Sequence, residues 1–430
     1  MKVFYVPWLH MHQPLIFLGN ELKSNLEKMI ISKDSKEAWD GKLIARAYKN
    51  PATYIKKLAD QGLNPKIMLD YSGILLESLE ELGNRNFFDF EISGEKVGNI
   101  IEAFKKILRK YPDCIEFAAT AYSHCYFPAT PQEDWKLQIE EWKNVFSRIF
   151  GKKILEKVKG FWLPELGVPG FGDKLKFLIK VLKEENIEWL FLPLQAVENY
   201  EQLSYEERIK IACMPHLLEV EGETIPVVFR APHYFIDQQA GCLPEKILEK
   251  IKEVERIFSK YNKPPIIIPA SDGENGNVMM NEFFPLTFEP LFKNFSEEFS
   301  SLTITEFLHK FYEKNGEIKP ESKIKLKLLG ASWINGHKLW LEGLRRIEMV
   351  KKIEILSKEF HEVEEKILEN FGEVEEIREA RKLLLISETS CYVYWNVDFW
   401  FEQGEKVMEI LRGKINNLRK KYLYHIGKRI

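Results

Sequence analysis

Two acidic residues, Glu165 and Asp272, each come directly after an apolar segment that we expect to form a strand. Glu165 follows residues 161–164 (FWLP), and Asp272 follows the isoleucine-rich residues 266–270. Enzymes that cleave a glycosidic bond with retention use two carboxyl groups about 5–5.5 Å apart, one as nucleophile and one as acid and base. Two acids at strand ends would supply such a pair.

Each acid taken alone also has an ordinary structural explanation. Glu165 could begin a helix near Gly170, where a negative charge is favourable. Asp272 lies among typical turn formers in residues 271–277. The pairing favours chemistry. Whichever partner acts as acid must keep its proton at neutral pH, which requires burial or a neighbouring carboxylate. Glu274, two residues after Asp272, is placed to supply that neighbour.

The histidines allow two interpretations. His10 and His12 have the spacing that puts two imidazoles on one side of an extended chain. A barrel hydrolase that binds zinc through His10, His12 and Asp272 is one interpretation, although no further histidine completes a compact ligand pattern. Without a metal, neutral imidazoles would donate hydrogen bonds to sugar hydroxyls. His124 would join them unless it is simply a core histidine. Arg230 would offer a planar fork to a carboxylate or a hydroxyl pair.

Trp333 and Trp340 lie in one short segment, residues 330–343. They would either pack between two parts of the protein or stack against the flat face of a pyranose ring.

The elements that would position these residues follow an alternating pattern. Short apolar runs predict strands, and segments with apolar residues at i, i+3, i+4 and i+7 predict helices between them. This alternation is typical of an α/β fold with a largely parallel sheet. The strands are expected near residues 2–9, 65–70, 115–120, 159–163, 188–192, 226–230 and 265–270. Amphipathic helices are expected at 97–110, 172–186 and 245–260, and further helices at 304–315, 343–371, 373–388 and 402–424.

The candidate residues fall at the carboxyl ends of these strands. In a barrel of parallel strands the active site lies at that end, because the loops that follow the strands converge there. Segments far apart in the sequence would then share one opening, which favours an enzyme over a binding module.

Composition excludes several classes of partner. The chain has 62 basic and 65 acidic residues and a net charge of -3, so no electrostatic attraction to nucleic acid or to an anionic membrane is expected.

Five widely spaced cysteines are expected to be reduced thiols: Cys114, Cys125, Cys213, Cys242 and Cys391. The N-terminal residues contain no stretch typical of a signal peptide, which predicts a cytoplasmic location. The abundance of Lys, Glu and Ile hints at a thermophilic source.

Five ordered segments carry a resemblance to a known family. They are HMHQP at 10–14, AYSHCYFP at 121–128, GFWLPELG at 160–167, ASDGENGN at 270–277 and GASWINGHKLWLEG at 330–343. Together they resemble the motifs of glycoside hydrolase family 57, a mostly thermophilic family that acts on α-glucans. The resemblance covers most of the chain.

The resemblance implies an α/β fold, an incomplete seven-stranded (β/α) barrel at residues 1–300, followed by a helical domain at 301–430 that contributes to the substrate groove. It implies retaining chemistry with Glu165 as nucleophile and Asp272 as acid and base, with no metal and no cofactor. It also implies a substrate site formed by His10, His12, His124, Trp162, Arg230, Asp237 and Trp333. Position and residue type add Glu274 and Trp340 to the expected members. The expected partner is an α-glucan or a maltooligosaccharide.

Within the family, the fifth motif looks most like the amylopullulanase and α-amylase branch. Residues 390–395 (SCYVYW) and 275–277 (NGN) depart from that branch, so 4-α-glucanotransferase or glycogen branching enzyme is the alternative. A zinc-dependent hydrolase and a catalytically silent glucan-binding protein are more distant alternatives.

Overall fold

The computed structural model describes residues 2–238, 241–274 and 281–423. A parallel sheet forms one half of a barrel, with strand order β14-β2-β5-β8. These strands are β14 (Ala270–Asp272), β2 (Trp8–Met11), β5 (Ile67–Tyr71) and β8 (Ile115–Phe117). The register places Asp272 beside His10 and His10 beside Asp70. Three polar side chains thus reach the same edge of the sheet.

The other half of the barrel continues in chain order with three parallel strands. They are β9 (Gly160–Trp162), β10 (Trp189–Leu192) and β12 (Glu223–Phe229). A parallel bridge between Ala119 and Phe161 joins this half to β8. On the other side, Ala231 N donates to Ile268 O at 2.9 Å. With β1 (Phe4–Tyr5) pairing with β13 (Ile266–Ile267), all seven predicted strand regions take part, and the predicted (β/α)7 barrel fold is confirmed.

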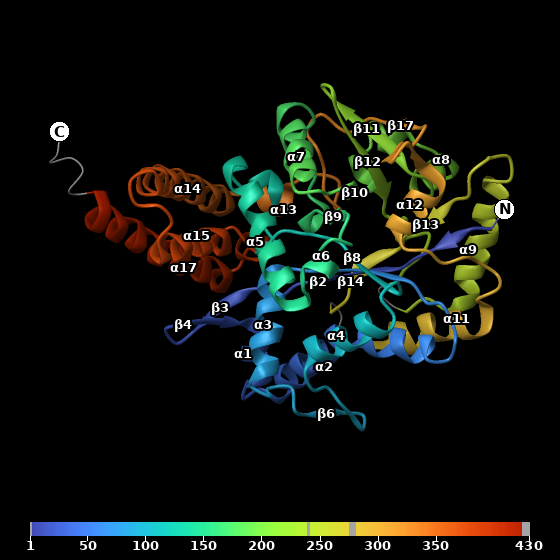
Figure 1. Ribbon diagram of the computed structural model, residues 1–430, viewed down its shortest axis with the longest axis horizontal. Coiled ribbons are helices and arrows are strands. Elements are labelled where there is room, and N and C mark those ends of the chain that lie inside the picture. The colour runs from blue at the N-terminus through green and yellow to red at the C-terminus, as the bar shows by residue number, and fades with distance from the viewer. Residues whose placement is uncertain (1, 239–240, 275–280, 424–430) are drawn as a thin grey trace.

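Amphipathic helices surround the strands (Figure 1). They are α2 (Ser35–Ala59), α3 (Gly73–Asn84), α4 (Ile100–Lys110), α5 (Gln132–Phe150), α7 (Asp173–Glu184), α8 (Tyr205–Ala212) and α9 (Pro244–Ile257). In α4, the apolar residues at positions 100, 101, 104, 107 and 108 are buried. The side chain of Asn99 caps this helix by accepting from the Glu102 amide. Hydrophobic periodicity therefore explains the helices expected at 97–110, 172–186 and 245–260, and a side-chain cap supports the first of them.

The interior of the barrel is packed with large side chains. Trp8, Trp162, Trp189 and Phe191 form an aromatic cluster there with Met68 and Val228. Helix α12 (Ile304–Tyr312) belongs to the same cluster, and its Phe307 contacts Phe4 edge to face at 5.3 Å. Because α12 fills the end of the barrel at which the strands begin, the site must lie at the opposite end.

The last part of the chain is helical and extends to one side of the barrel (Figure 1). It contains α13 (Lys338–Leu341), α14 (Leu344–Phe371), α15 (Glu375–Ser387), α16 (Cys391–Tyr394) and α17 (Asp398–Leu418). These helices share a separate hydrophobic cluster. The long helices expected at 343–371, 373–388 and 402–424 are confirmed within the described residues; the last one begins four residues earlier, and residue 424 lies outside the described part of the chain. The domain boundary at residue 300 stays a prediction. Helix α12, which follows that residue, packs in the hydrophobic cluster of the barrel and not in that of the later helices.

Short elements complete the structure. They are β3 (Leu15–Leu18), β4 (Glu21–Ser24), α1 (Asn25–Ile30), β6 (Glu91–Ile92), β7 (Glu95–Lys96), α6 (Lys152–Leu155), β11 (His216–Val220), α11 (Glu289–Phe295), β15 (Glu313–Lys314), β16 (Glu317–Ile318) and β17 (Lys323–Ile324). Among the described helices, none has the length and apolar character needed to cross a membrane.

Candidate active site

A cavity of about 700 Å³ opens at the carboxyl ends of the barrel strands. Ten of the eleven residues expected at the site line it: His10, His12, His124, Trp162, Glu165, Arg230, Asp237, Asp272, Glu274 and Trp333. The chain thus brings together side chains that are up to 323 positions apart, the separation of His10 and Trp333. The expected meeting of the strand-end residues is therefore observed, whereas their chemical roles stay predictions.

Glu165 lies in a short 3₁₀ turn, Pro164–Leu166, directly after β9. Its backbone has φ 58°, and that of Leu166 has φ 47°, so two successive residues with side chains adopt the left-handed region. Such conformations cost roughly 1–3 kcal/mol each and occur where surrounding structure enforces them, often at functional sites. The turn therefore holds the carboxylate in a defined direction at some cost in stability.

Two donors contact the Glu165 carboxylate. Trp333 Nε1 donates to Oε2 at 3.0 Å, and Ser390 Oγ donates to Oε1 at 3.4 Å. Burial and the nearby Asp272 raise the pKa of Glu165 to about 7, against the opposing effect of these donors. The side chain is thus partly protonated at neutral pH in the free protein.

Asp272 and Glu274 extend from the end of β14 towards the cavity. Gly273 N, between them, donates to His10 O at 2.7 Å and fixes this turn to β2. Burial and Asp272 raise the pKa of Glu274 to about 8. Glu274 Oε1 accepts from the His12 amide at 3.1 Å, while Oε2 is buried without a protein partner. Because Glu274 is mostly neutral at pH 7, its free oxygen is available to a ligand hydroxyl.

His10 is held between a carboxylate and a second histidine. Its Nδ1 lies 2.5 Å from Asp70 Oδ2, and its Nε2 lies 2.8 Å from His124 Nε2. Burial alone would lower the pKa of His10, but Asp70, together with Asp272 and Glu274, outweighs that effect and raises it to about 9. Trp8 Nε1 holds the other oxygen of Asp70 at 2.6 Å. His10 is therefore an imidazolium, with both ring nitrogens donating.

His12 and His124, in contrast to His10, are neutral at pH 7. Burial and the positive charge of His10 lower both pKa values well below the usual range, with a further contribution from His12 at His124. His12 Nδ1 is 2.7 Å from Ser72 Oγ, and His12 Nε2 is buried without a protein partner. A neutral imidazole with one free nitrogen suits a sugar hydroxyl.

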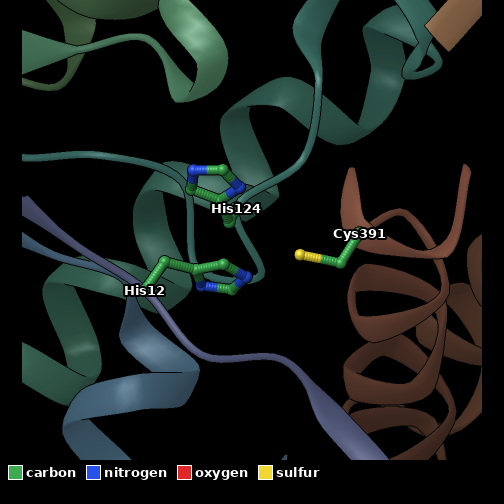
Figure 2. A group of neighbouring side chains, drawn as sticks. All are labelled: His12, His124 and Cys391. Carbon is green, nitrogen blue, oxygen red and sulfur yellow. The ribbon is translucent and has the colours of Figure 1, made fainter. Parts of the chain in front are cut away.

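Among the described residues, one group has donor atoms close enough to consider for a metal: His12, His124 and Cys391, all within 4.8 Å of one another. Figure 2 shows the two rings one above the other, with the sulfur of Cys391 beside them. The rings are parallel within 9° at 4.1 Å, so their in-plane lone pairs run side by side and do not converge on a point. Both nitrogens of His124 also have hydrogen-bond partners. A tetrahedral ion would require these rings to reorient.

The zinc set considered from the sequence, His10, His12 and Asp272, is not assembled as ligands. Both ring nitrogens of His10 contact other side chains, Asp70 and His124. The hydrogen-bonded strand end therefore favours the interpretation without a metal.

Trp162 and Arg230 also line the cavity. The indole of Trp162 is parallel to the His10 ring within 9° at 4.9 Å, which fixes the imidazolium from below. Arg230 follows β12, and its Nε is buried without a protein partner. Burial lowers the pKa of Arg230 while Asp272 and Asp237 oppose this, and a guanidinium stays charged in any case.

Trp340 does not reach the cavity, and the expectation that it stacks on a sugar is wrong. Its side chain is 0% exposed and lies against Tyr126 at 4.1 Å, within the hydrophobic cluster of the helical region. A neighbouring residue of the same type, Trp333, is 36% exposed at the cavity. The packing alternative for Trp340 is the correct one.

Trp340→Ala is expected to destabilise the fold by about 3–5 kcal/mol, because it removes a fully buried indole. Chemical unfolding measures the loss, and kcat and KM should stay near wild type where the variant remains folded. The matched variant is Trp395→Ala, since Trp395 is 55% exposed and lines the cavity. A raised KM with unchanged stability in Trp340→Ala would contradict this assignment.

Sequence analysis expected the helical domain at 301–430 to contribute to the groove and identified Trp333, but it did not identify the cavity residues that follow α15. Cys391, Tyr394, Trp395 and Trp400 line the cavity, and Ser390 contacts Glu165. These residues lie in and beside the short helix α16 and in the first turn of α17, where residue type and spacing carry no chemical pattern. Gln13, Gln195 and Gln238 also line the cavity and were not identified.

Solved structures of known proteins share the fold of this chain. The fold resembles a glycoside hydrolase family 57-type branching enzyme from Pyrococcus horikoshii, with TM-score 0.67 and 16% identity over 99% of this chain and 96% of that one. It also resembles the α-amylase AmyC from Thermotoga maritima, with TM-score 0.62 and 13% identity over 99% and 94%. The 4-α-glucanotransferase from Thermococcus litoralis gives TM-score 0.62 and 18% identity over 97% of this chain and 60% of that one.

A search of curated proteins gives no match. The sequence model of glycosyl hydrolase family 57 matches residues 4–328, about three quarters of the chain. This range includes the residues that line the cavity except Trp333, Ile334 and the four from α16, its C-cap and α17. The chain therefore belongs to glycosyl hydrolase family 57 and is an enzyme that acts on glycosidic bonds.

Proposed function

We propose that the enzyme acts on α-glucans by double displacement, as an amylopullulanase or α-amylase, with Glu165 as nucleophile and Asp272 as general acid and base. The observation that carries the proposal is that both carboxyl groups line one cavity at the carboxyl ends of the barrel strands. The charge of Asp272 also acts on Glu165, because it contributes to the raised pKa of Glu165. Two acids that interact across one cavity are what retaining cleavage requires.

The proposed reaction has two steps. Glu165 attacks the anomeric carbon while Asp272 gives its proton to the departing glycosidic oxygen, which leaves a glucosyl ester on Glu165. Asp272 then takes a proton from an incoming hydroxyl, which attacks the anomeric carbon and restores the carboxylate. The unpartnered His12 Nε2, Glu274 Oε2 and Arg230 Nε are placed to bind hydroxyls of the glucose unit being transferred.

The identity of the incoming hydroxyl separates two candidate activities. Water gives hydrolysis, and a sugar hydroxyl gives transfer, as in a 4-α-glucanotransferase or a branching enzyme. The second candidate is favoured by the aromatic rim: Trp333 is half-buried, and Trp395 is 55% exposed at the cavity, where a second glucan chain could stack.

Product analysis distinguishes these activities. Maltoheptaose, amylose and pullulan are incubated with enzyme, and the products are resolved by chain length and by linkage. Shorter oligosaccharides and pullulan cleavage support the hydrolase. Longer oligosaccharides support a 4-α-glucanotransferase, and new α-1,6 linkages support a branching enzyme. Absence of any action on α-glucans would contradict the proposal.

The pH profile of kcat/KM is expected to rise as the pH increases through about 7. Glu165 must be ionised to attack, and burial with the nearby Asp272 raises its pKa to about 7, so acidification protonates the nucleophile. The acidic limb should therefore lie well above pH 4.3, the usual value of a glutamate. Glu165 and Glu274 both have a raised pKa, and the Glu274→Gln variant shows which of them causes the limb. If Glu165 causes it, the limb persists in that variant. A limb near pH 4–5 in the wild type would contradict the assignment.

A further inference from the structure

A continuous line of buried polar side chains connects Asp70 to Glu165. His10 Nδ1 is 2.5 Å from Asp70 Oδ2, and His10 Nε2 is 2.8 Å from His124 Nε2. His124 Nδ1 is 2.9 Å from Ser390 Oγ, and that hydroxyl is 3.4 Å from Glu165 Oε1. The four residues behind Glu165 are all buried.

The protons along this line can be assigned from one end. His10 is an imidazolium, so its Nε2 donates and His124 Nε2 must accept. A neutral His124 has one N–H, which is then on Nδ1 and donates to Ser390 Oγ. The hydroxyl proton of Ser390 is left to donate in turn, and Glu165 Oε1 is the acceptor it contacts. From His10 Nε2 onward, every donor in the line therefore points towards Glu165, while His10 Nδ1 donates to Asp70 at the other end.

Ser390 is fixed in this position by the barrel. Its backbone N donates to His124 O at 3.1 Å, and the preceding residue, Thr389, forms an antiparallel bridge with Cys125. Gln138 Nε2 donates to the Glu388 carboxylate at 2.7 Å. His124 itself has φ 60°, a left-handed conformation that these contacts help to enforce. A hydroxyl from the helical region is thus held against a strained part of the barrel.

We propose that Ser390 is a positioning residue for the reaction: its hydroxyl, oriented by the Asp70-His10-His124 line, holds one oxygen of the Glu165 carboxylate while Trp333 holds the other. This inference rests on the proposed role of Glu165 as nucleophile. The two donors fix the plane of the carboxylate, and the positive charge of His10 polarises the line so that the ionised form is favoured. A residue of the helical region thus helps to hold the Glu165 carboxylate in place.

Other groups also act on Glu165. Asp272 opposes its ionisation, and His10 favours it. Cys391, Tyr394 and Tyr126 respond to the charge of Glu165, so they also face it, but burial keeps all three protonated at neutral pH. Removal of the Ser390 hydroxyl leaves Asp272 and His10 in place, but it removes the contacts of that hydroxyl with His124 Nδ1 and Cys391 as well as with Glu165. The Ser390→Thr variant, which keeps the hydroxyl, is therefore the matched control.

A fluorescence titration tests the proposal without relying on catalysis. Trp333 donates directly to Glu165, so its emission should change as Glu165 ionises. The difference between wild type and Glu165→Gln should show a transition near pH 7. Ser390→Ala should move that midpoint upward by about one pH unit, because a donor to the charged form is lost. Ser390→Thr, which keeps the hydroxyl, should restore it.

Kinetics provide the second measurement. Ser390→Ala should lower kcat about tenfold with little change in KM, and should move the acidic limb of the pH profile by the same amount as the fluorescence midpoint. A Ser390→Ala midpoint equal to that of wild type, or a loss in Ser390→Thr as large as in Ser390→Ala, would overturn the proposal. If Ser390→Ala shifts the midpoint but neither it nor the wild type acts on glucans, the hydrogen bond from Ser390 to Glu165 is supported and the proposed function is contradicted.

Discussion

Glu165→Ala is expected to lose about 10⁴-fold or more of its kcat on α-glucans, because the group that forms the covalent bond is absent. Added azide should then restore turnover of an activated α-maltosyl fluoride. Azide enters the space of the missing carboxylate and attacks from the same face, so the product should be the β-maltosyl azide. NMR identifies the anomer directly.

Glu184→Gln is the matched control for this change. Glu184 is on α7 and pairs with Lys136 at the surface, so removal of its charge should leave turnover unchanged. Near-full activity in Glu165→Ala would contradict its role as nucleophile, as would a rescued product of α configuration.

Asp272→Asn is expected to lower kcat on glucans by about 10²–10⁴-fold, because the leaving sugar receives no proton. Formation of the glucosyl ester from α-maltosyl fluoride should remain fast, since fluoride leaves without protonation. The ester should then accumulate, because no base activates water. Rapid-quench kinetics measure this as a burst of fluoride followed by slow turnover.

Azide gives the opposite stereochemistry in this variant. It attacks the β-linked ester on Glu165 and yields the α-maltosyl azide. Opposite anomers from the two variants would assign both roles in one pair of experiments. The β anomer from Asp272→Asn, or equal losses on the fluoride and on glucans, would require the roles to be exchanged or abandoned.

The barrel could be predicted from the sequence because its information is local. Each strand is a short apolar run that ends in a polar residue, and the helices between strands have one apolar face. The register of the parallel strands then brings His10, Asp70 and Asp272 to the same edge. The polar residues at strand ends therefore identified His10, His124, Arg230 and the two acids, whereas Asp237 was added by the family resemblance.

The fate of the two tryptophans could not be predicted in the same way. Trp333 and Trp340 are of one type and lie seven positions apart in one motif. The first remains at the cavity, and the second is buried because Tyr126, about 200 positions earlier in the chain, packs against it. Burial of such a residue is decided by tertiary contacts that no local pattern records.

The hydrogen bonds of the histidines were also beyond the sequence. The H-x-H spacing of His10 and His12 fits a metal site and a sugar site equally well. What separates the two is that Asp70 and His124 engage both ring nitrogens of His10, from different strands and loops. Ser390 could be predicted even less, because what points to its role is its contact with His124 and Glu165 in the folded protein.

Mechanism-based labelling tests the central assignment most directly. The wild type is incubated with 5-fluoro-α-glucosyl fluoride and with its maltosyl extension, then digested and analysed by peptide mass spectrometry. We predict a single 5-fluoroglycosyl ester on Glu165, absent when excess maltoheptaose protects the site. A label on Asp272 or on any other side chain, or rapid turnover with inversion and no label, would contradict double displacement through Glu165.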